Sequence, residues 1–145
     1  MKKAVLAAFV GAGMLAMGTG PVSAHHSSSM YDRDKEVELA GTIKQFQYTN
    51  PHSWLIVTVV GKDGSTVDWG FESEGPSSLL RAGIKISSLK PGEKVVVKGH
   101  PLRDGRPGAG LVSVAKTDGS VLSPDPALRR GPGGRPIDAP ATQNP

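Results

Sequence analysis

The sequence holds four histidines, His25, His26, His52 and His100, and no cysteine. If His25 is the first residue of a processed chain, its α-amine and its ring Nδ1 can chelate one metal ion together. One further imidazole, from His26, His52 or His100, would complete a T-shaped site of three nitrogens. Amine and imidazole nitrogens suit Cu(II), the tightest binder of the divalent series, and Met30 adds a soft ligand for Cu(I). We therefore expect copper as the candidate cofactor. The alternative is that the His-His-Ser-Ser-Ser run is a solvated arm that binds metal only adventitiously.

The chelate requires a cleavage between Ala24 and His25, and the N-terminus has the features of a secretory signal. Lys2 and Lys3 precede an uncharged, mostly apolar run over residues 4–18, and small residues occupy positions 22–24. The run is too short for a membrane span, and a chain without cysteine cannot carry a lipid on that residue. We expect residues 1–24 to be removed and the mature protein to be soluble and periplasmic.

Composition limits the remaining possibilities. The chain has 145 residues, and the mature part is large enough for one small domain and too small for a nucleotide-binding α/β fold. Without Lys2 and Lys3, 15 basic residues face 13 acidic ones, so the mature charge is about +2. No basic stripe for nucleic acid and no amphipathic basic helix for a membrane surface is present.

A second chemical feature is the run Asn50-Pro51-His52-Ser53-Trp54. Pro51 favours the start of a strand, and His52 and Trp54 then share one face of it. Both could contact a ligand or metal at the mouth of a barrel. Alternatively, His52 bonds a backbone carbonyl and Trp54 plugs the barrel end.

The third feature is the run from Trp69 to Glu74, in which Glu72 and Glu74 face the opposite way from Trp69 and Phe71. Two such carboxylates could serve acid–base chemistry or cation binding, but a pair of solvated glutamates is the commoner arrangement. Trp69 and Phe71 are expected in the core, and His100 is expected to cap a loop.

No phosphate loop or metalloprotease motif occurs, and Ser27–Ser29 do not form a catalytic triad with the histidines. We predict no catalytic residues and expect that the protein is not an enzyme.

Alternating apolar residues predict strands over residues 37–48, 52–60, 66–72, 94–100 and 111–116. A short helix around residues 79–83, capped by Ser77 or Ser78 and ended by Gly83, separates the third strand from the fourth. The order β-β-β-α-β-β predicts an all-β fold, a five-stranded OB-like small barrel. A small open β-sandwich or a roll is the alternative. The expected organisation is a signal peptide (1–24), a flexible N-terminal arm (25–36), the barrel (37–122) and a disordered Pro/Gly-rich tail (123–145).

Three stretches together resemble a family of short exported bacterial proteins of unknown function. They are the His-His start followed by residues 31–55 with its Asn-Pro-His-x-Trp step, the Trp-x-x-Glu strand at residues 67–83, and the Lys-Pro-Gly turn at residues 89–105. The resemblance covers about residues 24–116 and implies the fold and the export rather than an activity. In its chemistry, an N-terminal histidine beside a small β-barrel also resembles the periplasmic copper carriers.

We therefore expect a soluble periplasmic binding protein that binds copper through His25, with His52 or His100 and His26. The alternative is a module without metal, whose aromatic face contacts a protein partner, a glycan or an envelope polymer. Fold alone does not decide between these functions.

Overall fold

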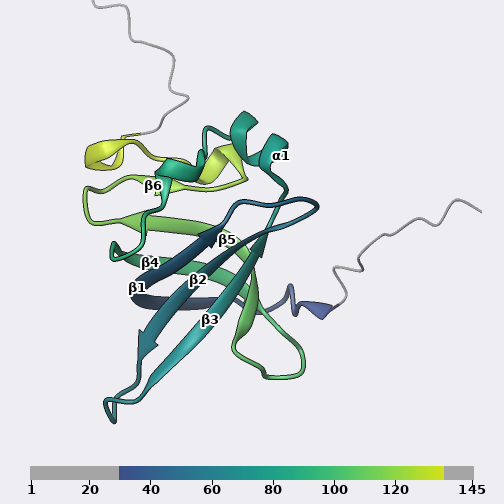
Figure 1. The fold of residues 1–145 in the computed structure, drawn as a ribbon, viewed down its shortest axis with the longest axis vertical. Coiled ribbons are helices and arrows are strands. Elements are labelled where there is room, and N and C mark those ends of the chain that lie inside the picture. The colour runs from purple at the N-terminus through teal and green to yellow at the C-terminus, as the bar shows by residue number, and fades with distance from the viewer. Residues whose placement is uncertain (1–29, 136–145) are drawn as a thin grey trace, which may run out of the picture.

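The structure is a computed structural model that describes residues 30–135 (Figure 1). The expected signal peptide, cleavage site, His25, His26 and residues 136–145 lie outside the described residues. Within them the chain forms strands β1 (Val37–Gln47), β2 (Ser53–Val60), β3 (Thr66–Ser73), β4 (Lys94–Pro101), β5 (Gly108–Lys116) and β6 (Val121–Leu122). Between β3 and β4 lie helix α1 (Pro76–Arg81) and the 3-10 turn η2 (Ile86–Ser88), and after β6 come η3 (Pro126–Leu128) and η4 (Pro132–Gly134).

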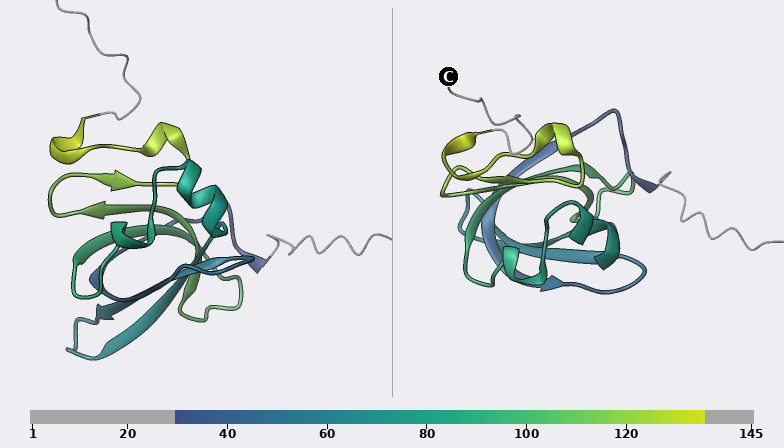
Figure 2. Two further views of the ribbon diagram at one scale, coloured as in Figure 1. Left: turned by 45° about the horizontal axis from the view of Figure 1, so that its top comes forward. Right: turned by 90° about the horizontal axis from the view of Figure 1, so that it is seen from above.

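The first five strands close into a barrel, which confirms the expected small all-β barrel. The sheet order is β3-β2-β1-β4-β5-β6, and a parallel pairing of β3 with β5 closes it. Seen from above, the strands form a ring with α1 over one opening (Figure 2, right). This strand arrangement is that of an OB barrel, so the open sandwich or roll is the wrong alternative. Closure removes the free sheet edges that a small open sheet would expose.

The barrel core comes from the inward side of the alternating strands. Val97 of β4 and Phe71 of β3 are fully buried, with Leu55 and Val57 from β2, Ile43 from β1 and Val114 from β5. Trp69 stacks on Phe71 at a centroid distance of 6.2 Å, as expected of core aromatics. Val67, which has the same strand alternation as Trp69 and Phe71, is nevertheless 43% exposed. It lies near the tip of the β2–β3 hairpin, which extends beyond the barrel at the lower left of Figure 1.

Strand β1 turns the corner of the barrel at Gly41. Residues 37–42 of β1 pair with β4, and residues 42–47 pair with β2. A Cβ atom on Gly41 would lie 2.5 Å from Val57 Cγ1 and 2.6 Å from the carbonyl oxygen of Thr58. Only glycine therefore allows β1 to cross β2 this closely.

The helix begins earlier than its sequence pattern suggests. Gly75 is the N-cap and Pro76 the first helical residue, and neither Ser77 nor Ser78 caps the helix with its side chain. Proline fits this position because its missing N–H would have no helical partner there. Gly83 ends the helix with a φ of 77°, as expected. The hydroxyl of Tyr48 donates to the carbonyl oxygens of Pro76 and Ile84, at 2.9 and 3.0 Å, and fixes this segment over the barrel end.

The expected boundary between barrel and tail at residue 123 is too early. Strand β6 pairs with β5, and Ser123 is fully buried with its hydroxyl donating to the Val112 carbonyl at 2.7 Å. Arg129 donates to the carbonyls of residues 123 and 124, and Gly133 N donates to the Asp118 carbonyl at 3.0 Å. Proline and glycine here form short 3-10 turns on the barrel surface. The Pro/Gly-rich composition therefore wrongly predicted disorder for residues 123–135.

Candidate functional site

The outer face of β2 and β3 carries the polar motif residues. Because side chains alternate along a strand, Ser53 and Leu55 point into the barrel while His52 and Trp54 point outward. Trp54 pairs with Glu72 of β3 across the sheet. The expectation that His52 and Trp54 share a face is therefore confirmed. The expectation that Trp54 plugs the barrel end is wrong, since Trp54 lies outside and a Cβ atom on Gly70 would meet its ring at 3.5 Å.

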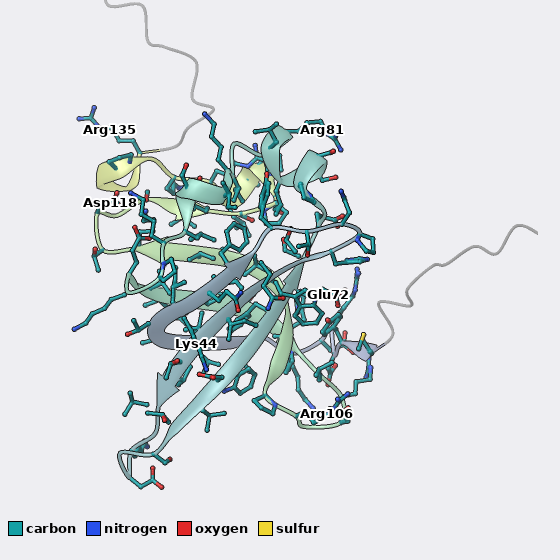
Figure 3. The ribbon with its side chains drawn as sticks, in the orientation of Figure 1. Lys44, Glu72, Arg81, Arg106, Asp118 and Arg135 are labelled. Carbon is teal, nitrogen blue, oxygen red and sulfur yellow. The ribbon has the colours of Figure 1, made fainter. Side chains whose placement is uncertain are left out.

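Glu72 lies near the end of β3, at the side of the barrel where the described chain begins (Figure 3). Its Oε1 is 3.1 Å from Nδ1 of His52, and its Oε2 accepts a hydrogen bond from the hydroxyl of Tyr31. The Glu72 side chain is only 16% exposed, so these two donors compensate much of the cost of burying the carboxylate. With both oxygens engaged, Glu72 orients His52. For Glu72, the sequence predicted only a possible ligand contact and not this contact with His52.

The segment that leads into β1 is fastened to the barrel rather than loose. Asp32 N donates to the Pro101 carbonyl at 2.8 Å, and Arg103 N donates to the Met30 carbonyl at 3.0 Å. The Asp32 carboxylate lies 3.0 Å from the Lys35 ammonium and 3.6 Å from the Arg103 guanidinium. The hydrogen bond from Lys35, with the two positive charges, lowers the pKa of Asp32. For residues 30–36, the expected flexible arm is thus a docked segment.

Tyr31 is the anchor of this segment. It forms an isolated β-bridge with Leu102, and its ring packs over Gly110 of β5. The pKa of Tyr31 is raised, first by burial and then by the hydrogen bond to Glu72 and the carboxylate charge. Tyr31 therefore stays protonated, as a donor, over the physiological pH range. The sequence contains no local signal for this contact, because Tyr31 and Glu72 are 41 positions apart.

His52 and His100 line one pocket, which we call the histidine pocket. Its volume is about 260 Å³, and its wall also contains Met30, Tyr31, Arg33, Glu72, Ser73, Glu74, Gly110 and Leu111. Nδ1 of His100, which belongs to β4, lies 2.8 Å from the carbonyl oxygen of Lys35 and donates to it, so His100 caps the loop before β1, as expected. The Nδ1–H that His100 donates leaves the lone pair of its neutral imidazole on Nε2. Nδ1 of His52 lies 3.1 Å from Oε1 of Glu72, which favours the same tautomer.

Two further hollows adjoin the histidine pocket around Met30 and Trp54. One, of about 520 Å³, shares Met30, His52 and Glu72 with it and extends to Gln47, Thr49 and Asn50. The other, of about 350 Å³, shares Met30 and Tyr31 and extends to Arg106 on the β4–β5 loop. The face of the second and third strands, bordered by the β1–β2 and β4–β5 loops, is where OB folds bind ligands.

The described residues do not form a complete metal site on their own. Between residues 30 and 135, no group of three or more histidine or acidic side chains is close enough to hold a metal ion. Of the expected ligands, the structure brings His52 and His100 to one pocket, while His25 and His26 lie outside the described residues. Two pre-oriented imidazoles fit the donor set that copper needs, provided that further nitrogens come from elsewhere.

The outer face of β1, β4 and β5 has a separate hollow of about 390 Å³. Its wall holds no histidine or acidic residue and consists of Ala40, Gly41, Thr42, Lys94, Val95, Val96, Ala115, Lys116 and Thr117. Across the described part of the chain, no helix is long and apolar enough to cross a membrane.

Comparison with known proteins shows a family without a known activity. No curated protein and no solved structure matches the chain. The profile of the family of unknown function DUF6152 matches residues 12–111, more than half of the chain, and this range includes His52 and Glu72. The chain therefore belongs to the family of unknown function DUF6152.

Proposed function

We propose that this protein is an exported, periplasmic copper-binding protein whose site combines the processed N-terminus at His25 with His52. The observation that carries the proposal is that His52, His100 and Met30 line one pocket, while Met30 is only five residues beyond His25. Five residues of extended chain span at most about 17 Å. The amine and ring of His25 can therefore reach a ligand beside Met30 without any change in the barrel.

The environment of His52 supports its role as the third nitrogen ligand. A histidine that binds a metal through Nε2 commonly donates its Nδ1–H to a carboxylate or a carbonyl, which fixes the ring and raises its basicity. Glu72 provides such a carboxylate at 3.1 Å. In His100 the acceptor is a carbonyl instead of a carboxylate: its Nδ1 donates to the carbonyl oxygen of Lys35. His52 is the stronger candidate because it borders both the histidine pocket and the adjoining hollow next to Met30.

The test is a Cu(II) titration of protein that begins at His25, against a competing chelator. We expect one equivalent to bind, a higher melting temperature with copper, and weaker binding as pH falls through about 6 to 7, where imidazoles protonate. One additional residue before His25 converts the amine to an amide and should weaken binding by at least about tenfold, or 1.4 kcal/mol. Equal affinity of the extended and native forms would contradict the proposal.

A second candidate function, an interaction module without metal, is supported by a different observation. Trp54 is half-buried between two hollows, with Arg106 at the edge of one of them. An aromatic ring beside polar side chains can stack on a sugar or on a side chain of a partner protein. Trp54→Ala separates the candidates, because it should abolish partner binding and leave the nitrogen ligands of copper unchanged.

A further inference from the structure

Tyr31, Glu72 and His52 form one chain of side-chain contacts that joins three separate parts of the fold: a hydrogen bond from Tyr31 to Glu72 and a close contact between Glu72 and His52. Tyr31 comes from the segment before β1, His52 from the turn before β2, and Glu72 from β3. The Tyr31 hydroxyl donates to one oxygen of the Glu72 carboxylate, and Nδ1 of His52 lies 3.1 Å from the other oxygen. The position of the carboxylate therefore depends on both donors at once.

We infer that Tyr31 is a positioning residue for copper: by holding Glu72, it keeps His52 in the orientation and tautomer that bind the metal. The inference rests on the proposed function and deepens it. A carboxylate that is only 16% exposed and loses one donor has an oxygen left without a protein partner. It would then turn toward water or toward another donor, and the His52 ring would lose its fixed acceptor.

The Tyr31 hydroxyl can be removed without releasing the segment before β1, because backbone hydrogen bonds and the Tyr31 ring hold this segment on the barrel. Met30 and Asp32 bond through their backbones to Arg103 and Pro101, and the Tyr31 ring packs over Gly110. None of these contacts uses the phenolic hydroxyl. Tyr31→Phe should therefore keep the segment docked and remove only the hydrogen bond to Glu72.

A matched control exists at Tyr48. It is also half-buried, and its hydroxyl donates to the carbonyls of Pro76 and Ile84 at the end of the barrel beneath α1. Tyr48→Phe removes a phenolic hydroxyl without altering the Glu72–His52 pair. Any loss of copper affinity that follows merely from a weakened fold should appear in both variants.

The experiment measures two quantities on the full mature chain beginning at His25. The first is the ring ¹⁵N chemical shifts of His52 without metal, which report whether Nδ1 or Nε2 carries the proton. The second is the Cu(II) affinity. For Tyr31→Phe we expect a mixture of His52 tautomers and a fall in affinity of about tenfold, the lower end for loss of a partner outside the ligand shell. Tyr48→Phe should change neither quantity.

The outcomes separate this inference from the proposed function. If the native protein binds copper and Tyr31→Phe keeps both the tautomer and the affinity, the positioning role is overturned while the proposed function stands. If the native protein does not bind copper, the proposed function fails. A shifted His52 tautomer in Tyr31→Phe would then still support the link through Glu72, and an unshifted one would overturn it.

Discussion

The ring of Tyr31 packs directly on Gly110 of β5: a Cβ atom on Gly110 would lie 3.4 to 3.6 Å from three of its ring carbons. The absent side chain leaves room for the ring against the strand, with the hydroxyl beside Glu72. This contact joins the start of the described chain to the face that carries His52. It is therefore a point at which the segment before β1 is held against the barrel.

Substitutions at Gly110 test how closely the Tyr31 ring packs on β5. In Gly110→Ala the added carbon meets the ring at ordinary contact distance, and we expect the segment to stay docked. In Gly110→Val the γ carbons would enter the volume of the ring and should displace Tyr31. Limited proteolysis near residue 30 should be faster in the valine variant alone. Equal cleavage of both variants would show that the Tyr31 ring does not rest on β5.

The barrel core should not tolerate a carboxylate at Val97, which is fully buried in β4. Burial of an unpaired carboxylate costs several kcal/mol, against a total stability of about 5 to 15 kcal/mol for a domain of this size. Val97→Asp should therefore unfold the protein or prevent its accumulation. Val96→Asp is the control, because Val96 points to the outer face. Thermal melting of the two variants checks the strand alternation, and similar melting would refute it.

Truncations should distinguish residues 123–135 from the end of the chain. Removal of residues 123–145 deletes the buried Ser123 and its hydrogen bond to Val112. We expect this truncation to lower the melting temperature by several degrees, since about 1 kcal/mol corresponds to 4–8 °C in a domain of this size. Removal of residues 136–145 deletes none of the described contacts and should have the smaller effect. An unchanged melting temperature for the longer truncation would contradict the docking of residues 123–135.

Acid should destabilise the protein through its turn aspartates. Hydrogen bonds from Ser65 to Asp63 and from Ser120 to Asp118 lower the pKa of both carboxyls below their ordinary value of 3.8. In the folded state these groups hold protons less tightly than in the unfolded chain. Their contribution is thus present above about pH 4 and is lost as pH falls through the lowered folded pKa values. The urea midpoint should fall with pH in that range, and Asp118→Ala should show a shallower decrease. If the urea midpoint of Asp118→Ala fell with pH as steeply as that of the native protein, Asp118 would not be a source of the acid sensitivity.

The strands could be predicted because their physical signals are local. Apolar alternation marked the five barrel strands. The Asp63-Gly64 pair between the second and third strands is a local hairpin signal, and Gly64 has a φ of 81° in the β2–β3 turn. The same Asp-Gly-Ser sequence recurs at residues 118–120, where Gly119 has a φ of 83°. It is followed by Val121 and Leu122, so this repeat was the available signal for β6.

The site was predicted only in part, because its geometry depends on the closed barrel. Strand parity placed His52 and Trp54 on one face, and sequence reasoning selected Glu72 without a partner. The link from Tyr31 to Glu72 arises from the return of β5 beside β3, where Gly110 pairs with Glu72. Nothing in the residues near Tyr31 encodes that neighbour, and so this residue was missed.

The most direct test of the account is electron paramagnetic resonance of the Cu(II)-loaded protein that begins at His25, with nitrogen hyperfine structure used to count the ligands. The account predicts three nitrogens in the native protein and one fewer in His52→Ala, with the His25 chelate retained. His100→Ala serves as the matched variant, because His100 also lines the histidine pocket. Unchanged spectra in both variants would show that the N-terminus binds copper alone, and would contradict a site shared with the barrel.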